Sequence, residues 1–213
     1  MALFDLDGTL TRRDTLMQYV GGFLRRHPWR AVRLPLAVPA LLRFLVGRAD
    51  RGHLKAAFLK AVLGDSTRAE LKGWTDAFVA RVRERGLFDD ARAMLGRHRD
   101  RGDTLALLSA SPDLYVPELA AALGIADVTC TGLEWRSERL TGGLTTPNRR
   151  GAEKARCLEE LRARYPGRTI TAYGNAASDL AHLQLADEGV LVNGSRRARQ
   201  DAARLRISEV TWR

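Results

Sequence analysis

The sequence predicts an α/β protein, a three-layer sandwich in which helices cover both faces of a mostly parallel central sheet. Two observations lead to this fold class. Short apolar runs typical of buried parallel strands alternate with helical segments along most of the chain. Between residues 12 and 88 the pattern is helical throughout, which indicates a helical insert after the first strand.

The first strand, residues 2–6, is apolar and runs into turn residues, as a buried parallel strand does. The chain then becomes helical. We expect Asp14 or Thr15 to cap a first helix that ends before Pro28.

Three further helices are expected in the insert. Residues 34–45 and 54–62 carry apolar side chains at helical spacing, although prolines interrupt the first of these stretches. Thr67 and Glu70 have the spacing of a capping box and predict the start of the fourth helix.

After residue 88 strands and helices alternate again, which predicts βαβ units. The expected elements are a helix over 89–101, a strand over 104–109, a helix capped by Ser111, strands over 128–135 and 139–144 around a Gly-Gly turn, a helix over 151–161, a strand over 169–174, and a strand, an Asn-Gly turn and a helix over 189–200.

The composition is that of an ordinary folded protein. The 213 residues are 45% hydrophobic and 28% charged, enough for one domain with an insert. The two cysteines and the absence of a signal peptide before the first strand lead us to expect a cytoplasmic protein with packed thiols. The four histidines lack metal-site spacing, and we expect solvent-facing or capping roles for them.

The net charge of +10 is concentrated in the insert. Residues 12–88 contain 16 Lys+Arg and 6 Asp+Glu, which leaves 19 of each in the rest of the chain. A basic segment of this kind indicates an anionic partner, whether a phosphorylated substrate, a lipid surface or nucleic acid. Nucleic acid is the least favoured, because aliphatic side chains accompany the basic residues. A solvated, arginine-rich surface is the alternative.

Polar residues follow three of the expected strands. Asp5 and Asp7 follow the first, Ser109 ends the second, and Asn175 with Asp179 follows a later one. The carboxyl ends of parallel strands meet at one edge of a sheet, so we expect these side chains to converge there. Gathered carboxylates repel one another unless a cation joins them, and this set of oxygen ligands suits Mg²⁺.

Lys154 is expected in the first turn of its helix, where its charge opposes the helix dipole at a cost of about 0.3–1 kcal/mol. This placement favours a role in neutralising a nucleophilic aspartate and a bound phosphate. A lysine directed toward solvent is the alternative.

The stretches FDLDGTLT, LLSAS, GAEK and YGNAASD, in this order, resemble the four motifs of the haloacid dehalogenase superfamily, and the resemblance spans nearly the whole chain. The insert is similar to the C1-type helical cap of its phosphoserine-phosphatase-like branch, subfamily IB. The resemblance implies a Rossmann-like core of residues 1–11 and 89–213 and a basic helical cap of residues 12–88. It also implies a Mg²⁺-dependent phosphomonoesterase that forms an aspartyl-phosphate intermediate.

The resemblance implies a role for each matching residue. Asp5 is expected to be the nucleophile, and Asp7 the general acid and base. The residues expected to bind phosphate are Thr9, Ser109, Lys154 and, through its backbone N–H, Ala110. The expected metal ligands are Asp5, Asp7, Asn175 and Asp179.

One motif departs from the family pattern. Asn175 stands where the family usually has an aspartate, and it offers a carbonyl oxygen with one negative charge less, so we expect weaker metal binding. In the cap, Asp14, Arg12 and Arg13 are candidate specificity residues. Asp14 is equally expected as a helix cap.

The stretch from residue 29 to residue 47 bears on the substrate. Its uncharged run, residues 34–42, is far shorter than the roughly 20 residues of a membrane-spanning helix. Arginines surround it, as in segments that lie in a lipid headgroup layer. The stretch resembles the cap of the phosphatidylglycerophosphatase C group, which favours a lipid phosphate such as phosphatidylglycerophosphate and peripheral contact with the anionic inner face of the cell membrane.

Three alternatives remain open. The stretch over residues 29–47 is also compatible with an ordinary cap helix packed on its neighbours. A second alternative is that the substrate is a small soluble phosphomonoester such as phosphoserine or histidinol phosphate. A chain that is not an enzyme, but a basic module that binds membranes or anions on a haloacid dehalogenase core, is the third alternative.

Overall fold

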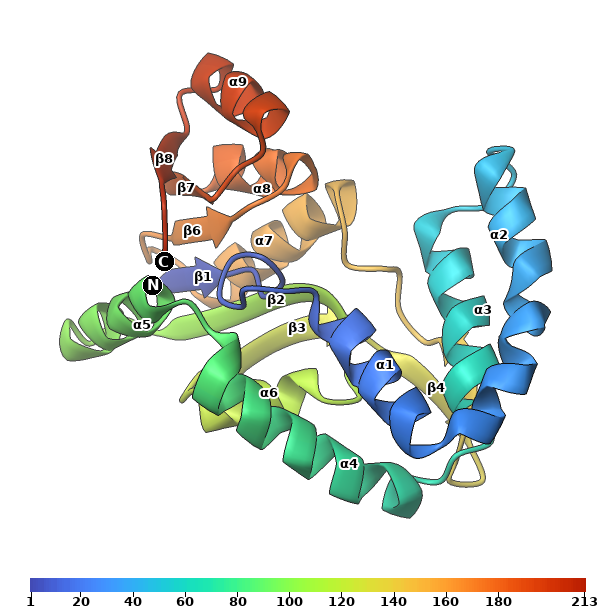
Figure 1. The fold of residues 1–213 in the computed structure, drawn as a ribbon. Coiled ribbons are helices and arrows are strands. Elements are labelled where there is room, and N and C mark those ends of the chain that lie inside the picture. Colours follow the sequence, from blue (N-terminus) through green and yellow to red (C-terminus); the bar gives the residue numbers. More distant parts are fainter.

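Six parallel strands form the centre of the computed structural model, which describes residues 1–213 (Figure 1). They are β1 (Ala2–Phe4), β2 (Leu105–Pro112), β3 (Asp127–Thr131), β6 (Thr171–Gly174), β7 (Glu188–Val192) and β8 (Ser208–Val210). Their order is β3-β2-β1-β6-β7-β8, and every neighbouring pair is parallel. The predicted α/β fold with a mostly parallel sheet is confirmed. The strand order reverses at β1, and the carboxyl ends of strands at such a point form a ligand-binding crevice.

Helices cover both faces of this sheet (Figure 1). One face packs against α7 (Ala152–Arg164), α8 (Leu180–Leu185) and α9 (Arg196–Arg204), and the other against α5 (Asp89–Asp100) and α6 (Val116–Ala122). Strand side chains alternate between the two faces of the sheet. Leu3 therefore packs in the apolar cluster on the α7–α9 side, and Phe4 packs in the cluster on the α5–α6 side. Both faces of β1 are therefore buried.

The segment between β1 and α5 is helical, as predicted. Its elements are α1 (Thr15–Arg26), the 3₁₀ helix η1 (Pro28–Ala37), α2 (Val38–Leu45), α3 (Arg51–Leu63), α4 (Arg68–Arg81) and the π turn η2 (Val82–Gly86). Asp14 caps α1 by accepting a hydrogen bond from the Met17 N–H, and Thr67 with Glu70 forms the predicted capping box of α4. The elements η1 and α2 follow one another as a single column. Pro35 lies in η1 and Pro39 at the start of α2, and because proline lacks the N–H of an α-helical hydrogen bond, a regular α-helix does not run through the whole column.

Most of this segment shares its apolar core with the sheet. Tyr19 of α1 and Phe78 of α4 belong to the same buried cluster as Phe4 of β1. The column η1–α2 differs, because Ala40 is its only buried residue. The division into a core of residues 1–11 and 89–213 and a cap of residues 12–88 stays a prediction.

A separate two-stranded hairpin, β4 (Leu133–Arg136) and β5 (Arg139–Leu144), packs against α3. At Gly142, which has a φ of +85°, a Cβ would lie 2.5 Å from the Cα of Lys60, so only glycine permits this approach. The predicted Gly-Gly turn is wrong. The hairpin turns at Ser137 and Glu138, both in the left-handed region, and the two glycines lie inside β5.

Other local predictions also fail. β2 continues through Ser111 to Pro112 and α6 begins at Val116, so Ser111 is not a helix cap. His98 and His182 are buried, contrary to the solvent-facing or capping roles expected for them. Neither side chain has a sequence neighbour that signals its burial, which arises from packing between distant segments. No helix combines the length and apolar character needed to cross a membrane.

Candidate active site

The loop after β1 carries the first candidate residues to the carboxyl edge of the sheet. The Asp5 N–H donates to the carbonyl of Tyr173 at 2.9 Å, which holds the start of this loop beside β6. Gly8 has a φ of +82°, and a Cβ there would lie 2.0 Å from Nδ2 of Asn175. Because residue 8 is glycine, this loop can pass directly against Asn175, a second candidate residue.

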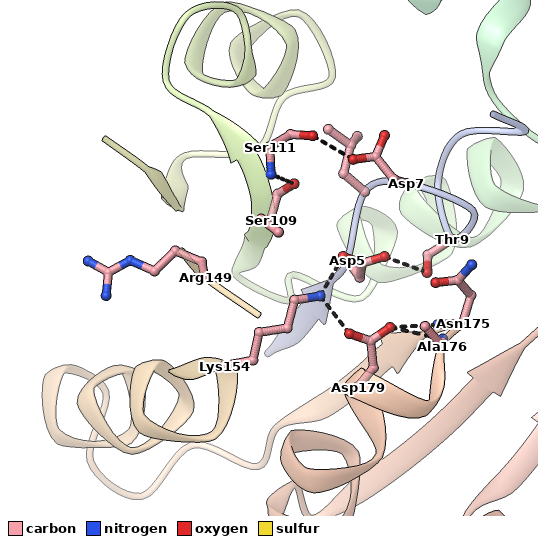
Figure 2. Close-up of polar contacts among 12 residues, drawn as sticks. Asp5, Asp7, Thr9, Ser109, Ser111, Arg149, Lys154, Asn175, Ala176 and Asp179 are labelled. Carbon is pink, nitrogen blue, oxygen red and sulfur yellow. Dashed lines mark hydrogen bonds and ion pairs between the residues drawn. The ribbon is translucent and has the colours of Figure 1, made fainter. Parts of the chain in front are cut away.

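Asp5 lies at the centre of the site and is 6% exposed (Figure 2). Its Oδ1 accepts a hydrogen bond from Nζ of Lys154 at 2.5 Å, and its Oδ2 accepts one from the hydroxyl of Thr9 at 3.0 Å. Burial raises the pKa of Asp5 to about 7, although Lys154 acts in the opposite direction. The negative charge at this carboxylate is thus only partly compensated by protein groups.

Lys154 is buried in the first turn of α7 and joins two carboxylates. Its Nζ donates to Asp5 and, at 2.8 Å, to Oδ1 of Asp179 (Figure 2). Burial lowers the pKa of Lys154, but the two carboxylates outweigh burial and the net shift is upward. The ammonium is therefore charged, and it faces the site rather than solvent.

Asp179 connects the segment after β6 to this group. Its Oδ2 accepts hydrogen bonds from the N–H groups of Asn175 and Ala176 at 3.1 and 3.0 Å. Burial raises the pKa of Asp179, but Lys154, His182 and the Ala176 N–H together lower it by more, so the net shift is downward. Asp179 is an ionised carboxylate that shapes the loop bearing Asn175.

Asp7 receives three hydrogen bonds at its carboxylate. The N–H and the hydroxyl of Thr15 both donate to Oδ1 at 2.6 Å, and the hydroxyl of Ser111 donates to Oδ2 at 2.6 Å. Burial raises the pKa of Asp7 although these donors lower it. Sequence reasoning missed Thr15 and Ser111 as site residues, because both were interpreted as helix caps.

The end of β2 lies beside these carboxylates. Ser109 is fully buried and does not line the cavity described below; its Oγ accepts the N–H of Ser111 at 3.0 Å (Figure 2). The backbone of Ala110 lines the adjacent cavity. The structure therefore brings together Asp5, Asp7, Thr9, Ser109, Ala110, Lys154, Asn175 and Asp179.

A cavity of about 530 Å³ opens over this group. One side is polar and contains Asp5, Asp7 and Lys154. The other side belongs to the helical insert and is largely apolar, with the charged Asp14, Arg51 and Lys55 also among its lining residues; the apolar ones include Leu34, Ala37, Val38, Leu41, Leu54 and Phe58. A ligand that fills the whole cavity is consequently amphiphilic.

Lys55 of α3 reaches this cavity from the insert and was not predicted. Its Nζ donates to the carbonyl of Ala110 at 2.6 Å and to Oδ1 of Asn148, which leaves the third ammonium hydrogen free. Burial lowers the pKa of Lys55 to about 8, although Asp7 and Asp14 favour its charged form. Only tertiary contact could reveal Lys55, because it lies in a helix whose sequence contains no motif.

The three candidate specificity residues of the insert lie in different places. Asp14 caps α1 and also lines the cavity. Arg12 does not line it, because its guanidinium pairs with Asp89 at 3.0 Å and stacks on the ring of Phe88. Arg13 is exposed and likewise lies outside the cavity lining. The structure thus leaves Asp14 as the one specificity candidate of the three in contact with the cavity.

The chain belongs to the haloacid dehalogenase-like hydrolase family, which matches residues 2–184. It is 34% identical over 195 residues to Protein CicA of Caulobacter vibrioides, a match that covers 88% of this chain and 83% of that protein. It is also 26% identical over 204 residues to phosphoserine phosphatase SerB1 of Mycobacterium tuberculosis, covering 93% of this chain and 66% of that one.

A similar fold occurs in the crystal structure of a protein with unknown function from Bordetella pertussis Tohama I. The TM-score is 0.82 at 23% sequence identity, and the match covers 99% of this chain and 97% of that one. The predicted membership of the family and the predicted enzyme class, a hydrolase with phosphatases among its relatives, are confirmed.

Proposed function

We propose that this hydrolase is a Mg²⁺-dependent phosphomonoesterase that works through a phosphorylated Asp5. The observation that carries the proposal is the pairing of the buried Asp5 carboxylate with Lys154, beside a second buried carboxylate, Asp7, whose position three hydrogen bonds define. Phosphoryl transfer requires a positioned nucleophile and neutralised charge, and this group of residues supplies both.

In the first step an oxygen of Asp5 attacks phosphorus, and the bond between phosphorus and the alcohol oxygen of the substrate breaks. Asp7 gives its proton to that oxygen as the alcohol leaves. Burial raises the pKa of Asp7, and an upward shift is the direction that a general acid requires. Lys154, the Ser109 hydroxyl and the backbone N–H of Ala110 stabilise the phosphoryl oxygens.

In the second step Asp7 accepts a proton from a water molecule, whose oxygen attacks the phosphorus bound to Asp5. The bond between phosphorus and Asp5 breaks, inorganic phosphate leaves, and Asp7 is again protonated. Thr15 and Ser111 hold the Asp7 carboxylate in one position for both proton transfers.

The residues present fit a magnesium ion. The fitting oxygens are the Asp5 carboxylate, the backbone carbonyl of Asp7 and the side-chain carbonyl of Asn175, with Asp179 completing the set; these are the hard oxygen donors that Mg²⁺ prefers. Burial, with the nearby Asp179 carboxylate, raises the pKa of Asp5 despite Lys154, so a further cation is compatible with this site. When bound by these residues, Mg²⁺ would add positive charge near the phosphoryl group.

We favour a lipid phosphate over a soluble metabolite as the substrate. The apolar wall of the cavity lies opposite the carboxylates, so a substrate with a phosphomonoester at one end and an apolar group at the other matches both sides. Phosphatidylglycerophosphate has this character. Lys55 extends beside Ala110 and can bind a second anionic group on the leaving alcohol, such as a phosphodiester. A lipid phosphate lies in a membrane surface, so an enzyme acting on it contacts that surface.

The mechanism is tested by phosphate release from an aryl phosphate in the presence of Mg²⁺. We expect Asp5→Asn to lower kcat by about 10⁴-fold or more and Asp100→Asn, a change of the same type on the exposed surface of α5, to leave it unaltered. Mass spectrometry of acid-quenched wild-type enzyme should locate a phosphoryl group on the Asp5 peptide. Substantial turnover by Asp5→Asn would exclude the mechanism.

The substrate class is tested by ranking kcat/KM for phosphatidylglycerophosphate in mixed micelles, phosphoserine and histidinol phosphate. A clear preference for the lipid is expected, because only the lipid fills the apolar side of the cavity. A wide margin in favour of either soluble compound would overturn the lipid assignment and leave the phosphatase mechanism intact.

A further inference from the structure

Exposed large apolar side chains are concentrated in one part of the molecule. Trp29 is 65% exposed, Val32 80% and Leu45 68%. Outside residues 29–46, the large hydrophobic residues with comparable exposure are Met17 and Leu185. The exposed group within that range consists of Trp29, Val32, Leu36, Val38, Leu41, Leu42, Leu45 and Val46, and we call it the apolar column.

The column formed by η1 and α2 is apolar on two faces. One face, with Leu34, Val38 and Leu41, lines the cavity of the active site. The other carries Trp29, Val32 and Leu45, which are exposed and do not line that cavity. A helix that is apolar all round is ordinarily buried, but η1–α2 forms an antiparallel pair with α3 at the side of the molecule away from β8 (Figure 1). Its outer face is therefore left uncovered by the rest of the chain.

Unpaired cations surround the apolar column. Arg25, Arg43 and Arg48 are exposed and form no ion pair, whereas the half-buried Arg33 pairs with Asp65. Residues 15–64 contain nine Lys+Arg and a single acidic residue, Asp50. The partner of this surface is thus both apolar enough to receive leucine and tryptophan side chains and negatively charged around them.

We infer that the apolar column docks on an anionic lipid bilayer, with Trp29, Leu36 and Leu45 among the acyl chains and Arg43 and Arg48 at the headgroups. Apolar side chains flanked by arginines are the combination by which a helix lies in the interface of a membrane. A second copy of the chain fits less well, because a symmetric contact would bring two arginine-rich segments together without acidic partners.

This inference rests on the proposed function in one respect, the choice of a lipid phosphate. The face of η1–α2 that carries Leu34, Val38 and Leu41 is also a wall of the cavity above Asp5. With the outer face in the bilayer, only η1–α2 separates the lipid phase from the cavity that contains the carboxylates. The docking surface and the substrate cavity are then two sides of one helical element.

The test is cosedimentation of the full chain with vesicles of phosphatidylcholine, either alone or mixed with phosphatidylglycerol. Binding is expected only to the anionic vesicles. The double change Arg43→Gln/Arg48→Gln should weaken it by about fivefold for each arginine, since one cation near such a surface contributes about 1 kcal/mol. The matched control is Arg196→Gln/Arg197→Gln, which removes two exposed, unpaired arginines from α9 and should leave binding unchanged.

The apolar contribution is tested with Trp29→Ser/Leu36→Ser/Leu45→Ser, which should weaken vesicle binding by about tenfold or more. Leu185→Ser, at an exposed leucine remote from the column, is the control. Of the four tryptophans, Trp29 is exposed, Trp135 is half-buried, and Trp74 and Trp212 are buried. Anionic vesicles should therefore shift the tryptophan emission of the wild type to shorter wavelength, and Trp29→Phe should abolish the shift.

Aryl phosphate hydrolysis without vesicles separates this inference from the proposed mechanism, because none of the substituted residues lines the cavity. If the protein hydrolyses the aryl phosphate but binds both vesicle types equally weakly, only the docking inference is overturned. Binding without hydrolysis overturns the phosphatase mechanism and leaves the docking surface standing. A dimer in solution that the column variants dissociate would show that a second copy covers this face, which also overturns the inference.

Discussion

The ammonium of Lys154 lies 2.5 Å from Oδ1 of Asp5, although the two residues are 149 positions apart in the chain. The same ammonium reaches Asp179 at 2.8 Å. One buried cation thus holds together two carboxylates that would otherwise repel each other.

Replacement of this lysine should separate catalysis from metal binding. We expect Lys154→Met to lower kcat for an aryl phosphate by about 10²–10³-fold, because the phosphoryl oxygens lose one positioned positive charge. Mg²⁺ binding, measured by calorimetry, should not weaken, since Lys154 competes with the metal for Asp5 and Asp179. A variant that retains near wild-type kcat would contradict the role of Lys154. Glu159→Gln, a charge change at an exposed position of α7, serves as the control.

The hydrogen bonds to Asp7 predict a second effect. Thr15→Val removes the hydroxyl that donates to Oδ1 and keeps the backbone N–H donor. We expect kcat to fall by about tenfold or more, because a hydrogen bond to a charged group contributes about 1.5–3 kcal/mol. Thermal unfolding should show that the variant is folded. An unchanged kcat in a folded Thr15→Val enzyme would show that the hydroxyl does not position Asp7.

Lys55 predicts a dependence on pH. Its pKa is lowered to about 8 by burial, so the ammonium is charged below this pH and loses its proton above it. For a substrate with an anionic group on its leaving alcohol, KM should therefore rise as the pH increases through about 8. Asp7 and Asp14 favour the charged lysine and Arg150 opposes it, so all three remain unchanged in the test.

Two variants check this assignment. Lys55→Arg keeps its charge at high pH, and the rise of KM should disappear. Lys55→Met should have a high KM at every pH. For an aryl phosphate without a second anionic group, the KM of the wild type should stay level across the same range. A rise with that substrate too would assign the pH dependence to another group.

Gly8 provides a fourth prediction. At Gly8→Ala the new Cβ meets Nδ2 of Asn175 at 2.0 Å and displaces that side chain. Gly102→Ala is a matched control, because Gly102 has a φ of +74° and open space around it. Both changes should destabilise the fold by about 1–2 kcal/mol through backbone strain. Only Gly8→Ala should weaken Mg²⁺ binding, which calorimetry measures; equal Mg²⁺ affinities in the two variants would argue against Asn175 as a ligand.

Several parts of the fold followed from the sequence because their signals are local. The capping box at Thr67 and Glu70 involves residues three positions apart, and the buried strand at residues 2–4 is recognisable from its own apolar run. Asp5 and Asp7 could be interpreted as site residues for a related reason. The carboxyl ends of parallel strands share one edge, so a correct order of strands and helices already indicates convergence.

Other parts could not be predicted, because they depend on contacts between distant segments. Ser111 has the local pattern of a helix cap, yet an irregular pairing of β2 with β3 extends the strand past it and directs its hydroxyl to Asp7. His98 is buried because it meets Tyr173, 75 positions later in the chain. No window of neighbouring residues contains either relationship.

The sequence by itself determined the family, the strands that carry the motifs and the helical, basic character of the insert, since periodicity, capping and motif order are all properties of neighbouring residues. Only the tertiary structure decided that Lys154 faces Asp5, that Lys55 enters the cavity, and that the apolar column leaves one face against the cavity and the other uncovered. The physical reason is that burial and charge pairing depend on which segments pack together, and packing joins residues that the chain order separates.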